Sequence, residues 1–187
     1  MPMIWIVLGV LAVIAIWIIS AFNGLVSLKN QTLNGWKQID VQLKRRHDLI
    51  PNLVETVKGV MKFEQTTLTQ VIEARNKAIS ADGVAQKAAQ ENVLSGALRQ
   101  LFALVENYPN LKSNENVSKL QEELSSTENR IGFARQFYND IATRFNIAQQ
   151  TFPTNIIANM FGFKASELFE ITDAAEREVP KVDLNLK

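Results

Sequence analysis

The residues best suited to chemistry lie in one stretch, DVQLKRRHDLIPNLVETVKG, which runs from Asp40 to Gly59. It holds the chain's only histidine, His47, directly after Arg46 and directly before Asp48. A histidine beside a carboxylate can act as a general base, and a run of cations can bind an acidic ligand. The same stretch also has the composition of a corner between two helices, so three interpretations compete.

Recognised catalytic and metal-binding motifs are missing from the sequence. A di-iron bundle needs Glu-x-x-His pairs, but the residue three positions before His47 is a lysine. The patterns H-E-x-x-H, G-x-S-x-G and G-x-x-x-x-G-K-[ST] do not occur, and the absence of cysteine excludes thiolate sites. We therefore expect no enzymatic activity and no cofactor.

The first element is predicted to be a membrane anchor. Met3 to Phe22 is an uninterrupted apolar run, and about 20 helical residues span the roughly 30 Å hydrocarbon core of a bilayer. Trp5 and Trp17 lie toward its two ends, as interfacial aromatic residues do. A cleaved signal peptide would need a basic start and a small-residue cleavage site, and neither is present.

Charge is distributed unevenly although 20 Lys and Arg nearly balance 19 Asp and Glu. That balance argues against nucleic acid as the main partner. The flank before the anchor has no cation, whereas Lys29 and Lys37 follow it. By the positive-inside rule the N-terminus is expected outside and the remainder of the chain in the cytoplasm.

Helical spacing of apolar residues dominates the part after the anchor, and strand patterns are absent. The third of four stripes comprises Val84, Ala88, Leu94, Leu98, Leu101 and Val105. The fourth, from Val117 to Phe152, alternates steps of three and four residues, which is typical of bundle packing. Ser113 is the expected N-cap of this last long helix. We predict an all-α protein. A transmembrane anchor (1–28) precedes an antiparallel, up-down bundle of four long helices (29–152) and a short helical C-terminal tail (153–187).

Pro51 leaves two possibilities for the first two bundle helices. One long helix could continue through it with a kink. Alternatively, the first helix ends near His47 and Asp48 caps a second one, whose first turn tolerates the proline. We favour the corner, since a helix of more than fifty residues is far longer than average. Lys44 to Arg46 would then complement the dipole of the first helix's last turn.

Five segments of the chain form a recognisable set: DVQLKRRHDLIPNLVETVKG, FEQTTLTQVIEARN, STENRIGFARQFYNDIATRFN, FPTNIIANMFGF and VPKVDL. Together they resemble the LemA family, and the resemblance extends from about Asn23 to Leu184. It implies a single N-terminal membrane helix and an antiparallel helical bundle, without established enzymatic activity or cofactor. One departure is Phe63-Glu64, where the family often has His-Glu. We place the protein in a bacterial inner membrane as a single-pass protein.

Polar residues beside the apolar stripes are predicted to form a partly buried network that sets helix register. The candidates for the helix corner and this network are Trp36, Asp40, Arg46, Asp48, Pro51, Glu64, Arg75, Glu128 and Arg135. The alternative is a metal or small-molecule pocket lined by Asp40, Glu64 and Glu128. Cations alternate with these acids along the sequence, which favours the network over the pocket.

The tail is rich in large apolar residues that a short segment cannot bury alone. The interaction candidates are Phe152, Ile156, Met160, Phe161, Phe163 and Phe169. They could cover their own bundle, a neighbouring subunit or lipid. The net charge of −2 over residues 153–187, from four cations and six carboxylates, argues against an anionic membrane surface.

From these features we expect a membrane-anchored scaffold that self-associates through its bundle and tail, or binds an as yet unidentified membrane protein. The alternative is a metal- or small-molecule-binding sensor or enzyme that uses the carboxylates beside the core.

Overall fold

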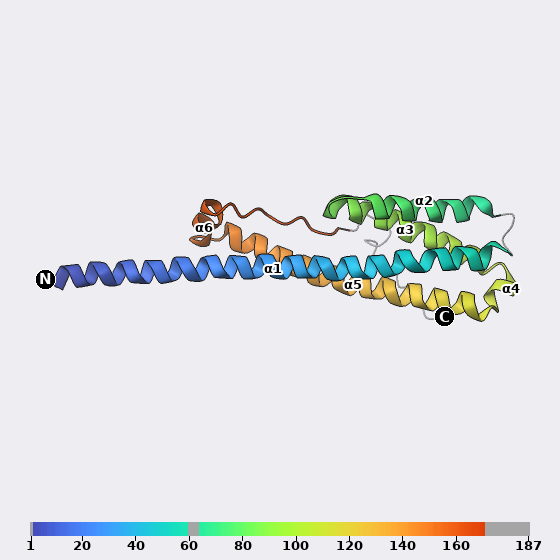
Figure 1. Cartoon of the computed structure of the whole chain (residues 1–187), viewed down its shortest axis with the longest axis horizontal. Helices are drawn as coiled ribbons and strands as arrows, with labels where there is room; N and C mark the ends of the chain where they lie inside the picture. The colour runs from blue at the N-terminus through green and yellow to red at the C-terminus, as the bar shows by residue number, and fades with distance from the viewer. Residues whose placement is uncertain (1, 60–63, 171–187) are drawn as a thin grey trace, which may run out of the picture. The chain divides into compact units, whose positions relative to one another are not determined.

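The computed structural model describes residues 2–59 and 64–170, and each regular element in those ranges is a helix (Figure 1). In chain order they are α1 (Pro2–Lys58), α2 (Gln65–Ser80), α3 (Val84–Val105), α4 (Pro109–Lys112), α5 (Glu115–Gln150) and α6 (Thr154–Met160). The predicted all-α class is confirmed, and the short helix predicted after Pro153 is present as α6.

Within the described ranges, α1 alone is long and apolar enough to cross a bilayer. Its most apolar window has a mean hydropathy of 2.8, and none of that window is buried. Met3 and Trp5 are exposed, whereas Trp17 and Phe22 are half-buried. A core helix of a soluble protein would bury such a surface, so the exposed apolar segment agrees with the predicted anchor.

The predicted corner at His47 and Asp48 is wrong. α1 continues through Pro51 to Lys58, and the chain leaves the helix only there. The second of the four predicted stripes is therefore divided between α1, with Leu53 and Val57, and α2, with Leu68 and Val71, while its fifth residue, Val60, lies outside the described residues. The cations at positions 44–46 lie inside the helix and do not complement its last turn.

A hydrogen bond from α2 explains how the helix continues past Pro51. Proline has no N–H, so the carbonyl of the residue four positions earlier, His47, loses its helical donor. Arg75 Nε donates to this carbonyl at 2.7 Å. The backbone acceptor that would otherwise be buried without a donor is satisfied by a charged side chain, and the helix need not end.

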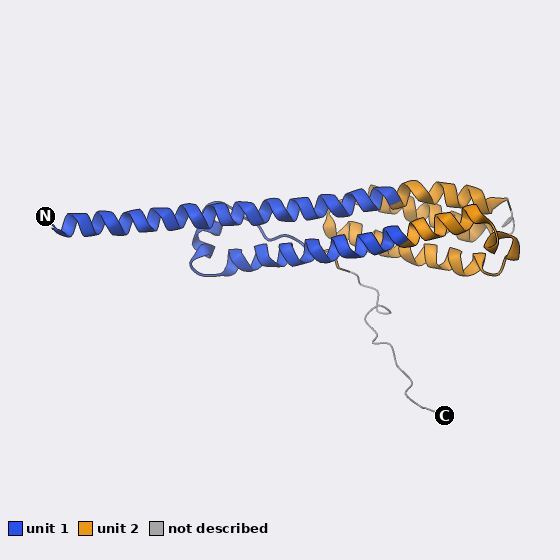
Figure 2. Cartoon of the chain, turned by 90° about the horizontal axis from the view of Figure 1, so that it is seen from below, with its two compact units in different colours: residues 1–45, 126–168 blue, residues 46–125, 169–187 orange. Residues whose placement is uncertain are grey.

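The chain forms two compact units, coloured separately in Figure 2. Unit 1 comprises residues 1–45 and 126–168, and unit 2 comprises residues 46–125 and 169–187. α1 and α5 each contribute to both units. The division of the chain at residues 28 and 152 stays a prediction.

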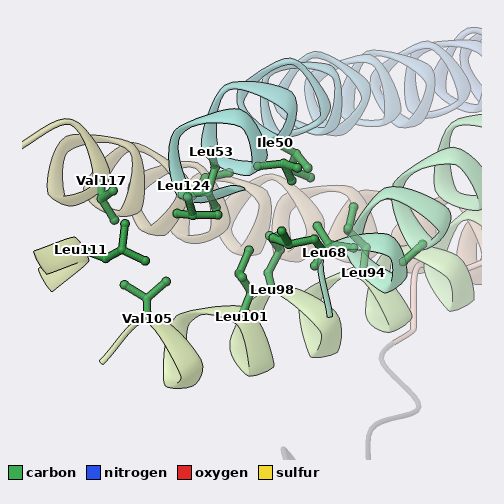
Figure 3. Packing of buried hydrophobic residues seen from close by; sticks show 14 of the residues in the cluster. Ile50, Leu53, Leu68, Leu94, Leu98, Leu101, Val105, Leu111, Val117 and Leu124 are labelled. Atoms are coloured by element: carbon green, nitrogen blue, oxygen red, sulfur yellow. The ribbon is translucent and has the colours of Figure 1, made fainter. Parts of the chain in front are cut away.

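Unit 2 has an aliphatic core to which α1, α2, α3, α4 and α5 all contribute (Figure 3). Ile50 and Leu53 of α1 are fully buried there, as are Leu94 and Leu101 of α3. α2 and α3 follow each other through residues 81–83 and pack side by side. This turn needs the positive φ of Gly83, 77°, which other residues rarely adopt.

The start of α5 corrects a smaller prediction. Ser113, expected to cap the last long helix, ends α4 instead. Asn114 performs the capping, because its Oδ1 accepts the backbone N–H groups of Asn116 at 2.9 Å and Val117 at 3.3 Å. Asparagine is among the best N-cap residues. The cap therefore lies one residue after the predicted position.

In unit 1, α1 and α5 approach closely at Gly35. A Cβ at this position would lie 3.3 Å from Tyr138 Cα, so only glycine fits without displacing the neighbouring helix. Next to it, the rings of Trp36 and Tyr138 lie 5.7 Å apart. Of the fourth predicted stripe, Ile131, Tyr138, Ile141 and Phe145 are buried as expected, whereas Phe152 at its end is exposed.

The segment after α6 returns along α5 and is held by side-chain bonds within unit 1. Asn146 donates to the carbonyl of Ser166 and accepts its N–H, both at 2.8 Å. The Tyr138 hydroxyl donates to the carbonyl of Glu167 at 2.6 Å. Of the six interaction candidates, Phe169 is buried and Phe163 is half-buried, whereas Phe152, Ile156, Met160 and Phe161 are exposed. What covers these four stays a prediction.

Replacing Arg75 tests why α1 is continuous. Arg75→Met should lower the free energy of unfolding by about 1.5–3 kcal/mol, because the His47 carbonyl loses a charged donor. In a Pro51→Ala background the cost should be clearly smaller, since the new N–H at position 51 can donate to that carbonyl. Urea unfolding in detergent, followed by circular dichroism, measures both costs.

Lys77→Met is the matched control, because Lys77 is an exposed cation on the same helix. Its effect should be small in both backgrounds. Equal costs of Arg75→Met with and without Pro51 would show that Arg75 stabilises the chain through some other contact.

Candidate functional site: the buried charged cluster of unit 2

Three ionisable side chains meet in the interior of unit 2. Arg46 and His47 come from α1, and Glu91 comes from α3. They are 2%, 7% and 3% exposed. We call these three residues the buried charged cluster.

Both carboxylate oxygens of Glu91 are engaged. Arg46 Nη2 pairs with Oε2, and His47 Nε2 donates to Oε1 at 2.8 Å. Arg46 also donates to the hydroxyl of Ser95, one turn further along α3, at 2.9 Å. One turn of α1 is thereby connected to two successive turns of α3.

The charge of Glu91 is favoured despite its burial. Burial by itself raises the pKa of the carboxyl group, because desolvation disfavours the charged form. The hydrogen bond from His47 and the positive charge of Arg46 outweigh this effect, and the pKa of Glu91 is lowered. The cluster therefore contains an ionised carboxylate paired with a buried guanidinium.

The geometry of the cluster suits positioning better than catalysis. A general base or nucleophile must reach a substrate, but these groups are buried and face one another. Among the described residues, no group of three His, Cys, Asp or Glu side chains could hold a metal ion. The arrangement can fix the rotation and register of α1 against α3, since any slip leaves a buried charge without its partner.

The three acids of the alternative pocket belong to different units, one to unit 2 and two to unit 1. Glu64 is half-buried in unit 2 and accepts a hydrogen bond from the Tyr108 hydroxyl at 3.3 Å. Asp40 and Glu128 are exposed residues of unit 1. The expectation that Glu128 is partly buried is therefore wrong.

The remaining network candidates have different roles. Arg46 belongs to the buried charged cluster, Arg75 donates to the His47 carbonyl and Trp36 contacts Tyr138. Asp48 and Pro51 are exposed on α1, and Arg135 is half-buried on α5. A buried ionic contact does join α1 to α3, but its carboxylate is Glu91 and not one of the predicted acids. That such contacts set helix register stays a prediction.

Sequence reasoning missed Glu91, although a signal was present. The third apolar stripe steps by six residues from Ala88 to Leu94, where steps of three and four are expected. Glu91 lies at the middle of that step, three residues from each neighbour. A lone acid that fills a gap in a core stripe predicts a buried partner of opposite charge, and the candidate cations were those beside His47.

Replacing Glu91 tests the role of the cluster. At neutral pH, Glu91→Gln should lower the free energy of unfolding by about 3–5 kcal/mol, because Arg46 stays buried without a counter-charge. The lowered pKa of Glu91 makes this stabilisation fully present above the ordinary carboxyl value of 4.5 and lost as the pH falls through the lower folded-state value. The stabilities of wild type and variant should therefore converge in acid.

Glu122→Gln, on the exposed surface of α5 in the same unit, is the control and should leave the pH profile unchanged. Unfolding midpoints in detergent at a series of pH values measure these differences. Parallel profiles for Glu91→Gln and wild type would show that Glu91 does not contribute an ionised form to stability.

Comparison with known proteins agrees with the sequence resemblance. Over 167 residues the chain is 28% identical to Protein LemA of Metamycoplasma hominis, covering 87% of this chain and 73% of that protein. It is 25% identical over 199 residues to Magnetosome protein MamQ 2 of Paramagnetospirillum magneticum, covering 92% and 73%. Magnetosome protein MamQ of Magnetospirillum gryphiswaldense is 23% identical over 184 residues, covering 84% and 68%. The model of the LemA family matches residues 35–184, and the chain belongs to the LemA family.

Proposed function

We propose that this protein is a non-enzymatic, membrane-anchored scaffold that presents a helical surface to other proteins. The observation that carries the proposal is the continuity of α1. One helix begins with an exposed apolar segment and ends in the core of unit 2. The anchor therefore leads into the folded part of the chain without a flexible linker, as suits a protein that holds partners at a membrane.

We further propose that the helical segments after the anchor form an up-down bundle. Four long segments are available, namely the second half of α1, α2, α3 and α5, and α6 adds a short helical end. The short α2–α3 connection and the shared core of unit 2 support this arrangement.

The fully engaged Glu91 carboxylate supports a structural rather than a catalytic use of the buried charges.

Self-association is proposed to use a groove between α1 and α5 in unit 1. Its volume is about 550 Å³, and its lining residues are Lys37, Gln38, Val41, Gln42, Arg130, Phe133, Ala134 and Phe137. Phe133 is 74% exposed and Phe137 47%. Large exposed aromatic side chains beside a groove are typical of protein contacts.

A second copy of this chain suits that groove. The groove carries the cations Lys37 and Arg130, and residues 29–47 have a net charge of +4. Residues 164–187, the charged end of the tail, hold four cations and six carboxylates, a net charge of −2. The acidic tail of a neighbouring copy would therefore be attracted to this surface, and a different membrane protein with an acidic, apolar segment could use the same contact.

Replacing both groove phenylalanines tests self-association. Phe133→Ser combined with Phe137→Ser should convert a discrete oligomer into smaller species, because it removes the apolar part of the groove. Ile147→Ser is the control, since Ile147 is 58% exposed on the same helix outside the groove. Size-exclusion chromatography with light scattering on detergent-extracted protein measures the mass. A wild-type monomer that carries a stoichiometric metal would instead support the sensor or enzyme alternative.

For orientation we propose an N-terminus outside the cell and the folded units in the cytoplasm, in a bacterial inner membrane. Lys29 and Lys37 after the anchor support this by the positive-inside rule. The chain has no cysteine, so a single introduced thiol can report its location.

A cysteine in the α2–α3 turn tests that orientation. Asp82 is exposed, so Asp82→Cys should be modified readily in broken cells. In intact cells it should resist a membrane-impermeant thiol reagent, because the cytoplasmic face is protected. Rapid modification in intact cells would place the folded units on the opposite side.

A further inference from the structure

α6 and its flanks form a segment without charge. Residues 145–163, FNIAQQTFPTNIIANMFGF, contain no acid, no base and no histidine. Every charged residue of the tail lies at position 164 or beyond. The net −2 of residues 153–187 therefore says nothing about α6 itself, and the charge argument against membrane contact does not apply to it.

One side of this segment packs within unit 1 and the other does not. Ile157 and Ala158 are buried with Leu25 and Phe145. The neighbouring Ile156, Met160 and Phe161 are 55%, 63% and 53% exposed, and Phe152 is 76% exposed (α6 in Figure 1). A helix of seven residues thus presents large apolar side chains outward even after it has folded against its own chain.

The buried side of α6 lies against the last turns of the predicted anchor. Trp17, Ile18, Ala21 and Phe22 of α1 pack against the cluster that contains Ile157 and Ala158. The Phe22 ring lies 4.7 Å from that of Phe161 and 5.9 Å from that of Phe163. α6 is therefore beside the end of the apolar segment rather than beside the charged part of α1.

Charged residues mark where this apolar surface ends. Lys29, the first cation after the anchor, lies over the Phe163 ring with its Nζ 5.8 Å from the ring centre. Lys164 follows Phe163 directly in the sequence. Aromatic residues bordered by lysine, at the end of an apolar helix, are the arrangement found where a protein meets the headgroup layer.

We propose that α6 inserts its exposed apolar side chains into the interfacial layer of the bilayer beside the anchor. The inference rests on the proposed membrane anchoring by α1. If that helix crosses the bilayer, its exposed Ile14, Ile16 and Ile19 face lipid. Phe161, at the end of α6 and 53% exposed, lies against Phe22 at the end of the same apolar segment.

A lipid surface fits α6 better than a second copy of the chain. The segment offers no charge for pairing with the +4 region of a neighbour and is joined to an apolar surface already assigned to lipid. A helix that lies in the interface buries its apolar side by about 5–10 Å, which side chains the size of methionine and phenylalanine can reach. The membrane attachment of unit 1 would then have two parts, a spanning helix and an interfacial one.

Single cysteines in the otherwise cysteine-free full-length chain test this inference. Each of Val10→Cys, Met160→Cys and Asp140→Cys is labelled with the environment-sensitive fluorophore NBD and reconstituted into phosphatidylcholine vesicles. Val10 lies in the anchor, Met160 on the outer side of α6, and Asp140 on an exposed part of α5 in the same unit. All three positions are exposed, so labelling leaves the packed core of unit 1 in place.

Lipids that carry a nitroxide quencher either near the headgroup or deep in the acyl chain then report depth. The label at Met160 should lose intensity with the shallow quencher, the label at Val10 should lose most with the deep one, and the label at Asp140 should change little with either. If the label loses fluorescence intensity at Val10 but not at Met160, the insertion of α6 is overturned and the anchoring proposal stands.

Two further outcomes are distinguishable. A blue-shifted but unquenched label at Met160 would show an apolar protein contact, such as a second copy, and would overturn the inference. An unquenched label at Val10 would overturn the anchoring proposal itself, and the insertion of α6 with it.

Discussion

The carbonyl of His47 has no backbone donor, because the residue that would supply the N–H is Pro51. The continuity of α1 depends on another group that donates a hydrogen bond to this carbonyl. Arg75 of α2 donates to that carbonyl at 2.7 Å. A helix that would otherwise end at a corner continues to Lys58. The backbone of α1 is thus completed by a side chain from another helix, so its continuity is a tertiary property.

The same turn of α1 also carries the side chains that join it to α3. Arg46 and His47 both contact Glu91, and the lowered pKa of Glu91 keeps a full charge opposite the buried guanidinium. Within these two residues, α1 therefore contacts α2 through the His47 carbonyl and α3 through the side chains of Arg46 and His47. Separating a buried ion pair leaves an uncompensated charge, which costs far more than the intact pair contributes to stability. The arrangement of this turn is therefore suited to disfavouring a shifted register of α1 against α3.

Unit 1 shows a different kind of packing. Its helices approach through small and aromatic residues, with Gly35 against Tyr138 and Phe22 against Phe161 and Phe163. Asn146 and Tyr138 hold the returning tail by its backbone. Among the described residues of unit 1 after the anchor, most exposed large apolar side chains lie in two places, the α1–α5 groove and α6 with its flanks, while Leu33 and Ile147 are exposed elsewhere. The first suits a protein partner because cations accompany it, and the second suits lipid because the segment is uncharged.

The sequence by itself determined the all-α class, the apolar N-terminal segment, the core stripe along α5 and the short helix after Pro153. These follow from periodicity and composition, which act locally and can be read from neighbouring residues. Only the tertiary structure decided that α1 passes through Pro51, because the compensating donor is Arg75, on another helix. It also decided which carboxylate pairs with Arg46: Glu91 is 45 residues away in sequence, and the nearby Asp48 is exposed. The free-energy cost of a proline inside a helix depends on which residues of other helices lie across the core, and so does the identity of a buried charge's partner. The order of residues along one helix does not contain that information.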